Sequence, residues 1–358
     1  MIFIFEGVLF TQSSEAATIS KVYWAILGDT VIRRANLDGT SREELLRTPG
    51  GIQPDIAFDL VEKKMYWPSP EAGGIQRANL DGSDIETVVS GIDEPLRVAL
   101  DSINRKVYWF DSANPNQLWR SSLDGTDREL LFNDIPFITA IEVDPLGGFF
   151  YWSEKLHGVI RRTALDLSLT EIVLDDMAFG RGPLPTGIAL DLSEGYLYAT
   201  DLVFNAIVRV GLDGSNPLLW LSEGVEFPES VAFDPLGQRV YWANSFPDKY
   251  IMSANIDGDD VTQEFLPTKF GGIGADNAEH LAILNLPIPE PRTTILFGSG
   301  AMILLLLTRA QERERLFCRI KETPKACDYR VWGKVRNVQW QHVHPRRPMN
   351  NGMKLSGN

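Results

Sequence analysis

The sequence predicts an all-β chain that folds as a six-bladed β-propeller. Three repeated features lead to this prediction: an aromatic pair that occurs six times, an Asp-Gly turn that keeps step with it, and an apolar run closed by aspartate before the pair. Repetition with a period of about 40–50 residues is typical of propellers with four strands in each blade.

The aromatic pair gives the spacing of the blades. It reads Tyr-Trp in five copies and Tyr198-Ala199 in one, at successive intervals of 43, 42, 43, 47 and 43 residues. We expect these pairs to pack in the core and between blades, the alternative being a platform on which sugars stack. The six tyrosines are Tyr23, Tyr66, Tyr108, Tyr151, Tyr198 and Tyr241.

The apolar run before each pair predicts the first strand of a blade, because β-branched and aromatic residues bounded by Pro, Gly and Asp are typical of strands. Its closing aspartates are Asp59, Asp101, Asp144, Asp191 and Asp234. Because they recur once per blade, we expect them to bind backbone groups of the next turn and to tie neighbouring blades together. The alternative is a calcium site at a central channel, since calcium prefers oxygen ligands. No other metal site or cofactor is predicted.

The last two strands of each blade flank an Asp-Gly turn, as residues 75–80 and 85–89 do around Asp81. Glycine accepts the positive φ that a tight turn requires; the fourth copy has Leu167 in its place. An arginine precedes the turn aspartate by four residues in five copies, and we expect an ion pair or a solvated side chain there, with a ligand clamp as the alternative. These arginines are Arg34, Arg77, Arg120, Arg162 and Arg209.

The two ends of the repeat region predict how the ring closes. The first copy, at Tyr23, has no apolar run before it, whereas residues 280–284 after the last copy form such a run without its aspartate. We expect these two segments to pair, because pairing removes the open edge of the ring. The propeller is therefore predicted over residues 21–285.

This pattern resembles the YWTD repeat, also called the low-density-lipoprotein-receptor class B repeat. The fourth-position aspartate of the family motif is kept at Asp111 and Asp201 only. The resemblance implies a propeller over residues 21–285. The cysteine-rich modules that usually flank the receptor propellers are not seen here, since the two cysteines are Cys318 and Cys327.

Residues 286–315 predict a sorting signal with one short transmembrane helix at about 293–308, an uncharged stretch between arginines. The layout resembles the PEP-CTERM signal of exported bacterial proteins, which implies processing by an exosortase-type enzyme. The alternatives are a permanent anchor and a buried core helix. The residues that carry the resemblance are Pro289, Glu290, Pro291, Arg309, Arg313 and Arg315.

The two ends of the chain lie outside the propeller. Residues 1–20 are mostly apolar at first and predict a truncated signal peptide, the alternative being a translation start that lies upstream, because no basic residue precedes the apolar stretch. Residues 316–358 form a basic tail that we expect to be disordered, either a cytoplasmic tail or translated sequence after a frame disruption. From Arg309 onward the formal charge is +8, which leaves −22 on the body.

The net charge of the chain and the differences between its repeats predict the class of function. A net charge of −14 argues against nucleic acid as a partner. We expect a non-catalytic, exported binding module, at the cell surface or membrane-anchored, whose ligand is an extracellular protein or glycan. A loop with Phe179 and Arg181 is the candidate ligand face, because it lengthens one repeat. The alternative is a metal-dependent, lactonase- or lyase-like propeller enzyme outside the cytoplasm, for which Glu142 and His280 are isolated candidates.

Overall fold

The computed structural model describes the propeller body and one short hairpin. The described residues are 18–25, 30–48, 53, 55–113, 115–175, 177–180, 182–245, 250–265, 280–287, 293–298 and 301–306. They fall into two units, residues 1–288 and 289–358, which we describe separately. The predicted signal peptide up to residue 17 and the tail at 316–358 lie outside the described residues, as do all six residues assigned to the sorting signal.

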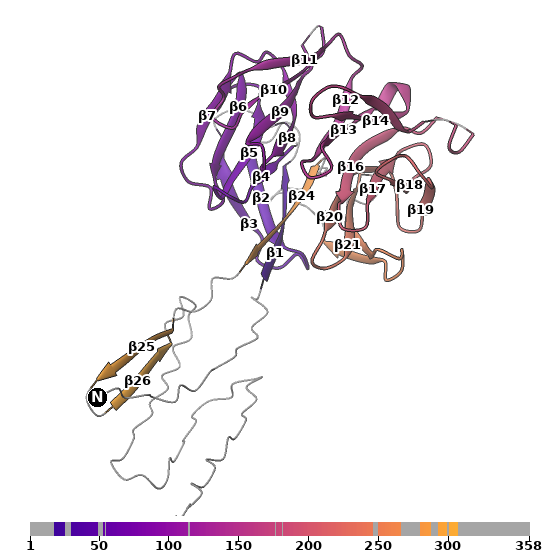
Figure 1. Cartoon of the computed structure of the whole chain (residues 1–358). Helices are drawn as coiled ribbons and strands as arrows, with labels where there is room; N and C mark the ends of the chain where they lie inside the picture. Colours follow the sequence, from indigo (N-terminus) through magenta and orange to yellow (C-terminus); the bar gives the residue numbers. More distant parts are fainter. Residues whose placement is uncertain are drawn as a thin grey trace, which may run out of the picture. The chain divides into compact units, whose positions relative to one another are not determined.

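Within its described residues, the first unit forms six four-stranded antiparallel sheets, and each sheet is one blade (Figure 1). Taken from the inner strand outward, the first three blades are β24 (His280–Pro287), β1 (Thr18–Ala25), β2 (Val31–Asn36) and β3 (Glu43–Arg47); β4 (Ala57–Asp59), β5 (Lys64–Ser69), β6 (Gly74–Asn79) and β7 (Glu86–Ser90); β8 (Pro95–Asp101), β9 (Lys106–Asp111), β10 (Gln117–Ser122) and β11 (Glu129–Asn133).

The other three blades follow the same order along the chain. They are β12 (Ile138–Asp144), β13 (Phe149–Glu154), β14 (Val159–Ala164) and β15 (Thr170–Leu174); β16 (Pro185–Asp191), β17 (Tyr196–Asp201), β18 (Ala206–Gly211) and β19 (Leu218–Leu221); β20 (Pro228–Asp234), β21 (Arg239–Asn244), β22 (Ile251–Asn255) and β23 (Thr262–Phe265). The predicted all-β, six-bladed architecture is therefore confirmed. The fourth blade adds one 3-10 turn, η1 (Lys155–His157).

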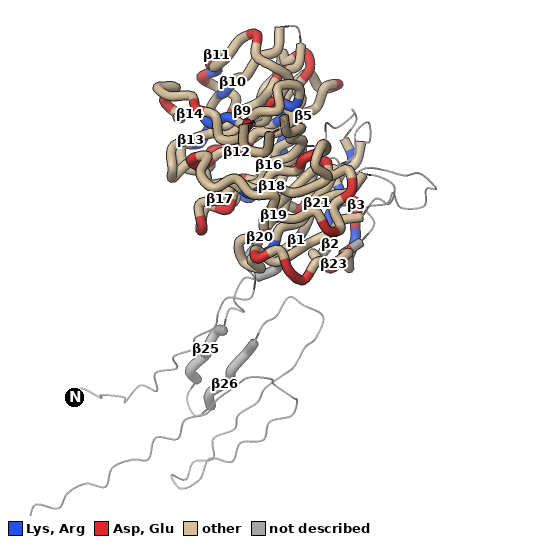
Figure 2. The backbone as a smooth tube through the Cα atoms, turned by 90° about the vertical axis from the view of Figure 1, so that its right-hand side faces the viewer, with Lys and Arg blue, Asp and Glu red and all other residues tan. Residues whose placement is uncertain are grey.

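Burial within a blade explains its sequence. The second strand, which carries the aromatic pair, is buried at five of six positions in β5, because a neighbouring blade covers each face of it. The outer strand β7 is exposed at three of five positions and begins with a glutamate. Charged residues on such an edge discourage pairing with another chain. Acidic and basic residues are spread over the turns and outer strands of the body (Figure 2).

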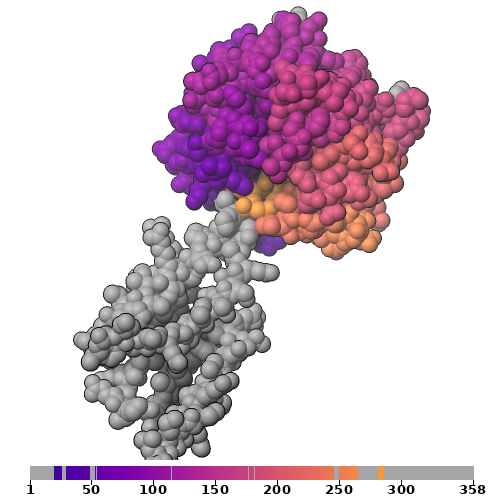
Figure 3. All heavy atoms as spheres, viewed as in Figure 1, coloured from indigo at the N-terminus to yellow at the C-terminus, as the bar shows by residue number. Residues whose placement is uncertain are grey.

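The ring closes by pairing the two ends of the repeat region. Strand β1 pairs with β24 along eight residues, from Thr18 opposite Pro287 to Ala25 opposite His280. In Figure 3 the orange residues of β24 lie between the indigo first blade and the last blade. The predicted closure is confirmed, and it gives the first blade an inner strand from the far end of the chain.

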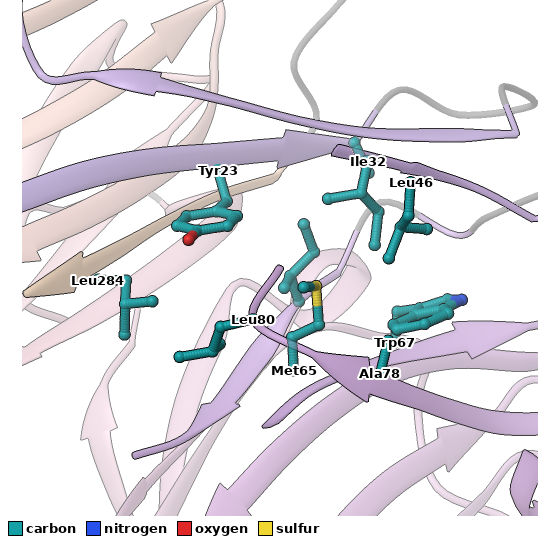
Figure 4. Close-up of a cluster of buried hydrophobic side chains, with 10 residues drawn as sticks. Tyr23, Ile32, Leu46, Met65, Trp67, Ala78, Leu80 and Leu284 are labelled. Atoms are coloured by element: carbon teal, nitrogen blue, oxygen red, sulfur yellow. The ribbon is translucent and has the colours of Figure 1, made fainter. Parts of the chain in front are cut away.

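The core consists of apolar clusters between adjacent blades. At the seam between the first two blades, Tyr23 and Ile32 from the first blade meet Met65 and Trp67 from the second, together with Leu284 of the closing strand (Figure 4). Tyr23 also packs edge-on against Phe58, with ring centroids 4.8 Å apart. The closing strand thus contributes to the core as well as to the sheet.

The second unit differs from the sequence expectation. Its described residues form a two-stranded antiparallel hairpin of β25 (Thr293–Gly298) and β26 (Ala301–Leu306), where a transmembrane helix was expected over 293–308. Threonine, isoleucine and phenylalanine favour strands, and glycine at 298 and 300 lowers helix propensity. Within the part of the chain that the structure describes, no helix has the length and apolar character of a membrane span.

Candidate functional site

The propeller has two faces, and the connections between strands define them. On the first, which we call the turn face, the connection from inner to second strand lies beside the Asp-Gly turn: the amide of Leu80 donates to the carbonyl of Lys63 at 3.1 Å, and that of Leu123 to Arg105 at 3.1 Å. On the second, the loop face, lie the connections from second to third strand and from each outer strand to the next blade. Strand β1 begins and β24 ends on the turn face.

A pocket opens where the inner strands begin, at the loop-face end of the central channel. Four charged side chains line it from different blades: Asp55 before β4, Arg97 on β8, Glu142 on β12 and Glu229 on β20. Its other lining residues are Thr139, Ala140, Ile141, Thr186, Gly187, Ile188, Ser230 and Val231.

A chain of hydrogen bonds between blades holds this pocket. Each bond joins one inner strand to the next, so the relative position of the blades is set at the channel wall. The bonds run from the Val98 amide to Asp55 Oδ2 (2.8 Å), Arg97 Nε to the Thr139 carbonyl (2.5 Å), Thr139 Oγ1 to the Pro185 carbonyl (3.0 Å), Thr186 Oγ1 to the Pro228 carbonyl (2.8 Å), and the Leu281 amide to Ser230 Oγ (2.7 Å).

Glu142 breaks the symmetry of the ring. It lies opposite Tyr151, and in the other five blades the residue opposite the corresponding tyrosine is alanine. Burial, together with the neighbouring carboxyl group of Asp55, raises the pKa of Glu142 to about 8. This side chain therefore exchanges a proton near neutral pH. The five alanines are Ala57, Ala99, Ala189, Ala232 and Ala282.

Exposed apolar side chains also lie on the loop face. Leu156 is 80% exposed, Met177 83% and Phe227 45%, and they come from three different connections. Phe179 of the lengthened loop packs edge-on against Phe204 of the next blade, with ring centroids 5.4 Å apart. The structure thus places Phe179 on the loop face, while Arg181 lies outside the described residues.

The repeated aspartates at the ends of the inner strands bind the turn that follows them. Asp191 Oδ1 accepts hydrogen bonds from the amides of Ser193 and Glu194 at 3.0 and 3.1 Å. Two of the aspartates also reach the next blade: Asp59 accepts from Arg105 at 2.6 Å, and Asp234 from Asn285 at 3.0 Å. Asp101, Asp144 and Asp234 accept backbone amides of their own turns in the same way.

The repeated arginines bridge consecutive blades. Arg120 Nε donates to Glu129 at 2.7 Å within its blade, and Nη1 donates to the carbonyl of Leu165 in the next blade at 2.6 Å. The guanidinium groups of the other four make the corresponding bond to the next blade: Arg34 to Leu80, Arg77 to Leu123, Arg162 to Leu212 and Arg209 to Ile256. These side chains form a structural ladder.

The Tyr-Trp pairs are buried. The six tyrosines are 0–3% exposed, and the five tryptophans of the pairs likewise. Burial raises the pKa of each tyrosine, and that of Tyr241 reaches about 12. Side chains buried to this degree offer no stacking surface to a sugar.

The fourth-position residue of the repeat orders the loop face. Asp111 accepts the amides of Glu94 and Ala113 at 3.0 and 3.1 Å. Asp201 accepts the amide of Leu184 at 2.6 Å. In the fourth blade Glu154 takes this place and is bonded to Arg161 Nε at 2.7 Å. Each of these carboxylates fixes a connection beside the channel mouth.

The two histidines of the propeller lie at different places, and only the side chain of His157 is described. His157 Nδ1 lies 3.2 Å from Glu154, at the rim. The backbone of His280 begins β24 at the register position of Asp55 in the second blade, but its side chain is outside the described set. Among the described residues, no group of three or more His, Cys, Asp or Glu side chains is arranged to hold a metal ion.

Sequence reasoning found Glu142 but missed the residues around it. Asp55, Arg97 and Glu229 come from different blades, and each occupies a position that differs between repeats. The alignment of the inner strands on their closing aspartates identifies two of them, because Asp55 and Arg97 stand four residues before the aspartate, where the next three blades have Ala140, Gly187 and Ser230.

Comparison with known proteins supports the fold. No family model matches the chain. A segment of 104 residues, 27% of the chain, is 32% identical to protein cueball of Drosophila grimshawi and covers 17% of that protein. A segment of 77 residues, 21% of the chain, is 36% identical to the vitellogenin receptor of Solenopsis invicta and covers 4% of it. The chain therefore matches only a small part of either relative.

A solved structure extends the likeness to the whole propeller. A chain in the crystal structure of a nidogen/laminin complex aligns with 74% of this chain and 98% of its own length, with a TM-score of 0.64 and 23% identity. This likeness shows the propeller fold.

Proposed function

We propose that this chain is an extracellular, non-catalytic β-propeller of the YWTD type that binds a protein ligand on its loop face. One observation carries the proposal. The symmetry of the ring is broken at the channel mouth, where Asp55, Arg97, Glu142 and Glu229 come from four different blades and none of them is repeated around the ring. A scaffold repeats itself, whereas binding residues concentrate on irregular connections above a rigid frame.

The turn face is the less suitable of the two. Its aspartates and Asp-Gly turns repeat around the ring and are occupied by hydrogen bonds within the fold. The chain also enters β1 and leaves β24 on that face.

A protein suits the loop face better than a glycan. Exposed apolar side chains at Leu156, Met177 and Phe227 lie on the loop-face connections, and burial of such side chains contributes much of the affinity of protein interfaces. The repeated Tyr-Trp pairs, which would be the obvious sugar platform, are buried. The partial likeness to a vitellogenin receptor and to a chain from a nidogen/laminin complex supports the same choice.

A selection on the full chain tests this proposal. Displayed fragments of extracellular proteins are selected on the wild type, and each binder is measured against two matched triple variants. The loop-face variant carries Leu156→Ser, Met177→Ser and Phe227→Ser, and the turn-face variant carries Val61→Ser, Leu146→Ser and Leu236→Ser, three side chains of similar exposure. We expect the first variant to weaken binding at least about tenfold, since buried apolar contacts contribute a large part of interface affinity. Loss confined to the turn-face variant would refute the proposal.

Sorting through residues 286–315 belongs to the same proposal. We expect an exosortase-type enzyme to process the chain near Pro289, Glu290 and Pro291 and release the propeller at the cell surface. The test is the intact mass of the surface fraction after expression in an exosortase-bearing bacterium. A mass that ends near 289–292 supports sorting, a full-length membrane form supports a permanent anchor, and recovery only as cytoplasmic protein contradicts export.

A second candidate function is catalysis at the channel mouth. The raised pKa of Glu142 favours it, because carboxyl groups that titrate near neutral pH are suited to general acid–base chemistry. A propeller lactonase or lyase would hold a divalent metal in the channel. A metal bound by the purified chain and lost in Glu142→Ala would place this candidate first.

A further inference from the structure

We infer that the channel mouth is a receptor for an ammonium group, such as a lysine side chain of the protein ligand, with Glu142 as its principal counter-charge. The inference rests on the proposed function, because it names the chemistry that the loop face recognises. Five blades place alanine at the register of Glu142, so neither the strand nor its neighbours require a carboxyl group there for folding.

The charges around the pocket favour a cation. Three carboxyl groups line it, from Asp55, Glu142 and Glu229, against the single guanidinium group of Arg97. That guanidinium group donates to the carbonyls of Thr139 and Leu96, at 2.5 and 3.3 Å, which directs it along the channel wall. The pocket therefore has an excess of negative charge when its acids are ionised.

The neutral polar groups of the pocket are already engaged with the wall. Thr139 and Thr186 donate their hydroxyl protons to the carbonyls of Pro185 and Pro228. Ser230 accepts the amide of Leu281. The groups of the pocket that can still form hydrogen bonds to a ligand are acceptor oxygens. An ammonium group carries three N–H donors and no acceptor, so it matches them.

A bound cation would change the protonation state of the Glu142 carboxyl group. Among the described residues its side chain makes no hydrogen bond or ion pair, and its carboxyl group is kept neutral up to about pH 8 by burial and by Asp55. A carboxyl group in this state becomes ionised when an opposite charge approaches. Binding of an ammonium group is thereby coupled to the release of one proton.

The strands packed against Glu142 supply no competing cation apart from Arg97. Strand β13 carries Tyr151, whose hydroxyl donates to the carbonyl of Leu212 at 3.3 Å, and Glu154, which is paired with Arg161. Strand β16 carries Asp191 at its turn-face end. Among the side chains that the structure describes, the charged groups that line the pocket with Glu142 are therefore Asp55, Glu229 and Arg97.

The test uses the full chain with two small probes that differ only in the terminal ammonium group. N-acetyl-lysine methylamide carries the ammonium group, and N-acetyl-norleucine methylamide lacks it. The carboxyl carbon resonance of Glu142 is followed in glutamate-labelled protein as each probe is added at pH 6.5 and 8.5. We expect the lysine probe alone to shift this resonance and to lower the pKa that it reports. We also expect about 20-fold tighter binding at pH 8.5, because only the ionised carboxylate pairs with the probe.

Two variants separate a specific site from a general effect. Glu142→Ala installs the residue of the other five blades and should fold normally. Glu142→Gln keeps the shape of the side chain without its charge. Both substitutions should abolish the pH-dependent binding of the lysine probe. Glu194→Gln on the turn face should leave it unchanged. Equal binding of both probes, or lysine binding that survives Glu142→Gln, would overturn the inference. A selected protein ligand that maps to the loop face yet tolerates Glu142→Gln would also overturn it while sparing the proposed function.

Discussion

At Gly125 the absence of a side chain lets the third and second blades approach each other. Its φ is 83°, and a Cβ atom added there would lie 1.8 Å from the carbonyl oxygen of Val88 in the neighbouring blade. Both the backbone conformation and the close approach require glycine. In the fourth blade Leu167 adopts a φ of 64° at the same place and packs against an apolar cluster, so the tight approach is not repeated in every blade.

We expect Gly125→Ala to lower the free energy of unfolding by about 2–4 kcal/mol, of which about 1 comes from the positive φ and the rest from overlap. The matched control is Gly148→Ala, since Gly148 has a φ of 78° with no atom within 4 Å of the added Cβ. It should cost about 1 kcal/mol. Urea denaturation measures both, and equal losses would show that the approach to Val88 has no role.

Glu142 makes stability depend on pH. Its pKa is about 8 in the folded chain against an ordinary value of 4.5, so between these values the folded state binds one proton more than the unfolded state. The free energy of unfolding should therefore fall as pH rises from about 4.5 to 8, by at most about 5 kcal/mol. In Glu142→Gln this contribution disappears. Denaturation of both proteins at pH 5.5 and 8.5 measures the difference, and parallel profiles would contradict a raised pKa.

At the scale of elements, the arginine ladder joins the third strand of one blade to the Asp-Gly turn of the next. Arg120 is 19% exposed and connects three elements: Tyr108 on β9, Glu129 on β11, and the carbonyl of Leu165 in the next blade. A guanidinium group suits this position because its donors point in several fixed directions at once.

We expect Arg120→Gln to lower the free energy of unfolding by about 2 kcal/mol, since a partly buried charged hydrogen bond to the next blade is lost. The control is Arg47→Gln. Arg47 is 61% exposed and pairs with Glu44 within one strand, so its loss should cost less than about 0.5 kcal/mol. Equal effects of the two substitutions in thermal denaturation would mean that the ladder contributes no more than a surface ion pair.

At the scale of the whole molecule, closure depends on eight residues from the far end of the propeller. Strand β24 pairs with β1 along its full length. Leu281 packs in the cluster between the last and first blades, and Leu284 packs in the cluster between the first and second blades. Without β24 the first blade loses its inner strand, and β1 becomes an unpaired edge.

A chain that ends at residue 279 should therefore melt more than about 10 °C below one that ends at 288, since several kcal/mol of core and sheet contacts are lost. The longer chain contains the whole first unit and serves as the control. Similar melting temperatures would show that the ring is held without its closing strand.

Sequence alone predicted most of this architecture, because repetition and turn residues are local signals. The Tyr-Trp pairs, the Asp-Gly turns and the missing first strand before Tyr23 specify the blades and their closure. The pocket was not predictable in the same way, since Asp55, Arg97 and Glu229 meet only when separate blades are arranged around one axis. The hairpin at β25 and β26 was missed because a short apolar run suits a helix as well as strands.

The central claim is that the loop face receives the ligand, and hydrogen exchange tests it most directly. A protein fragment from the selection is added to the full chain, and amide protection is compared with that of the free protein. We predict new protection in the loop-face connections at 134–137, 182–184 and 222–227, with none in the turn-face connections at 60–63, 145–148 and 235–238. Protection confined to the turn-face segments would contradict the account.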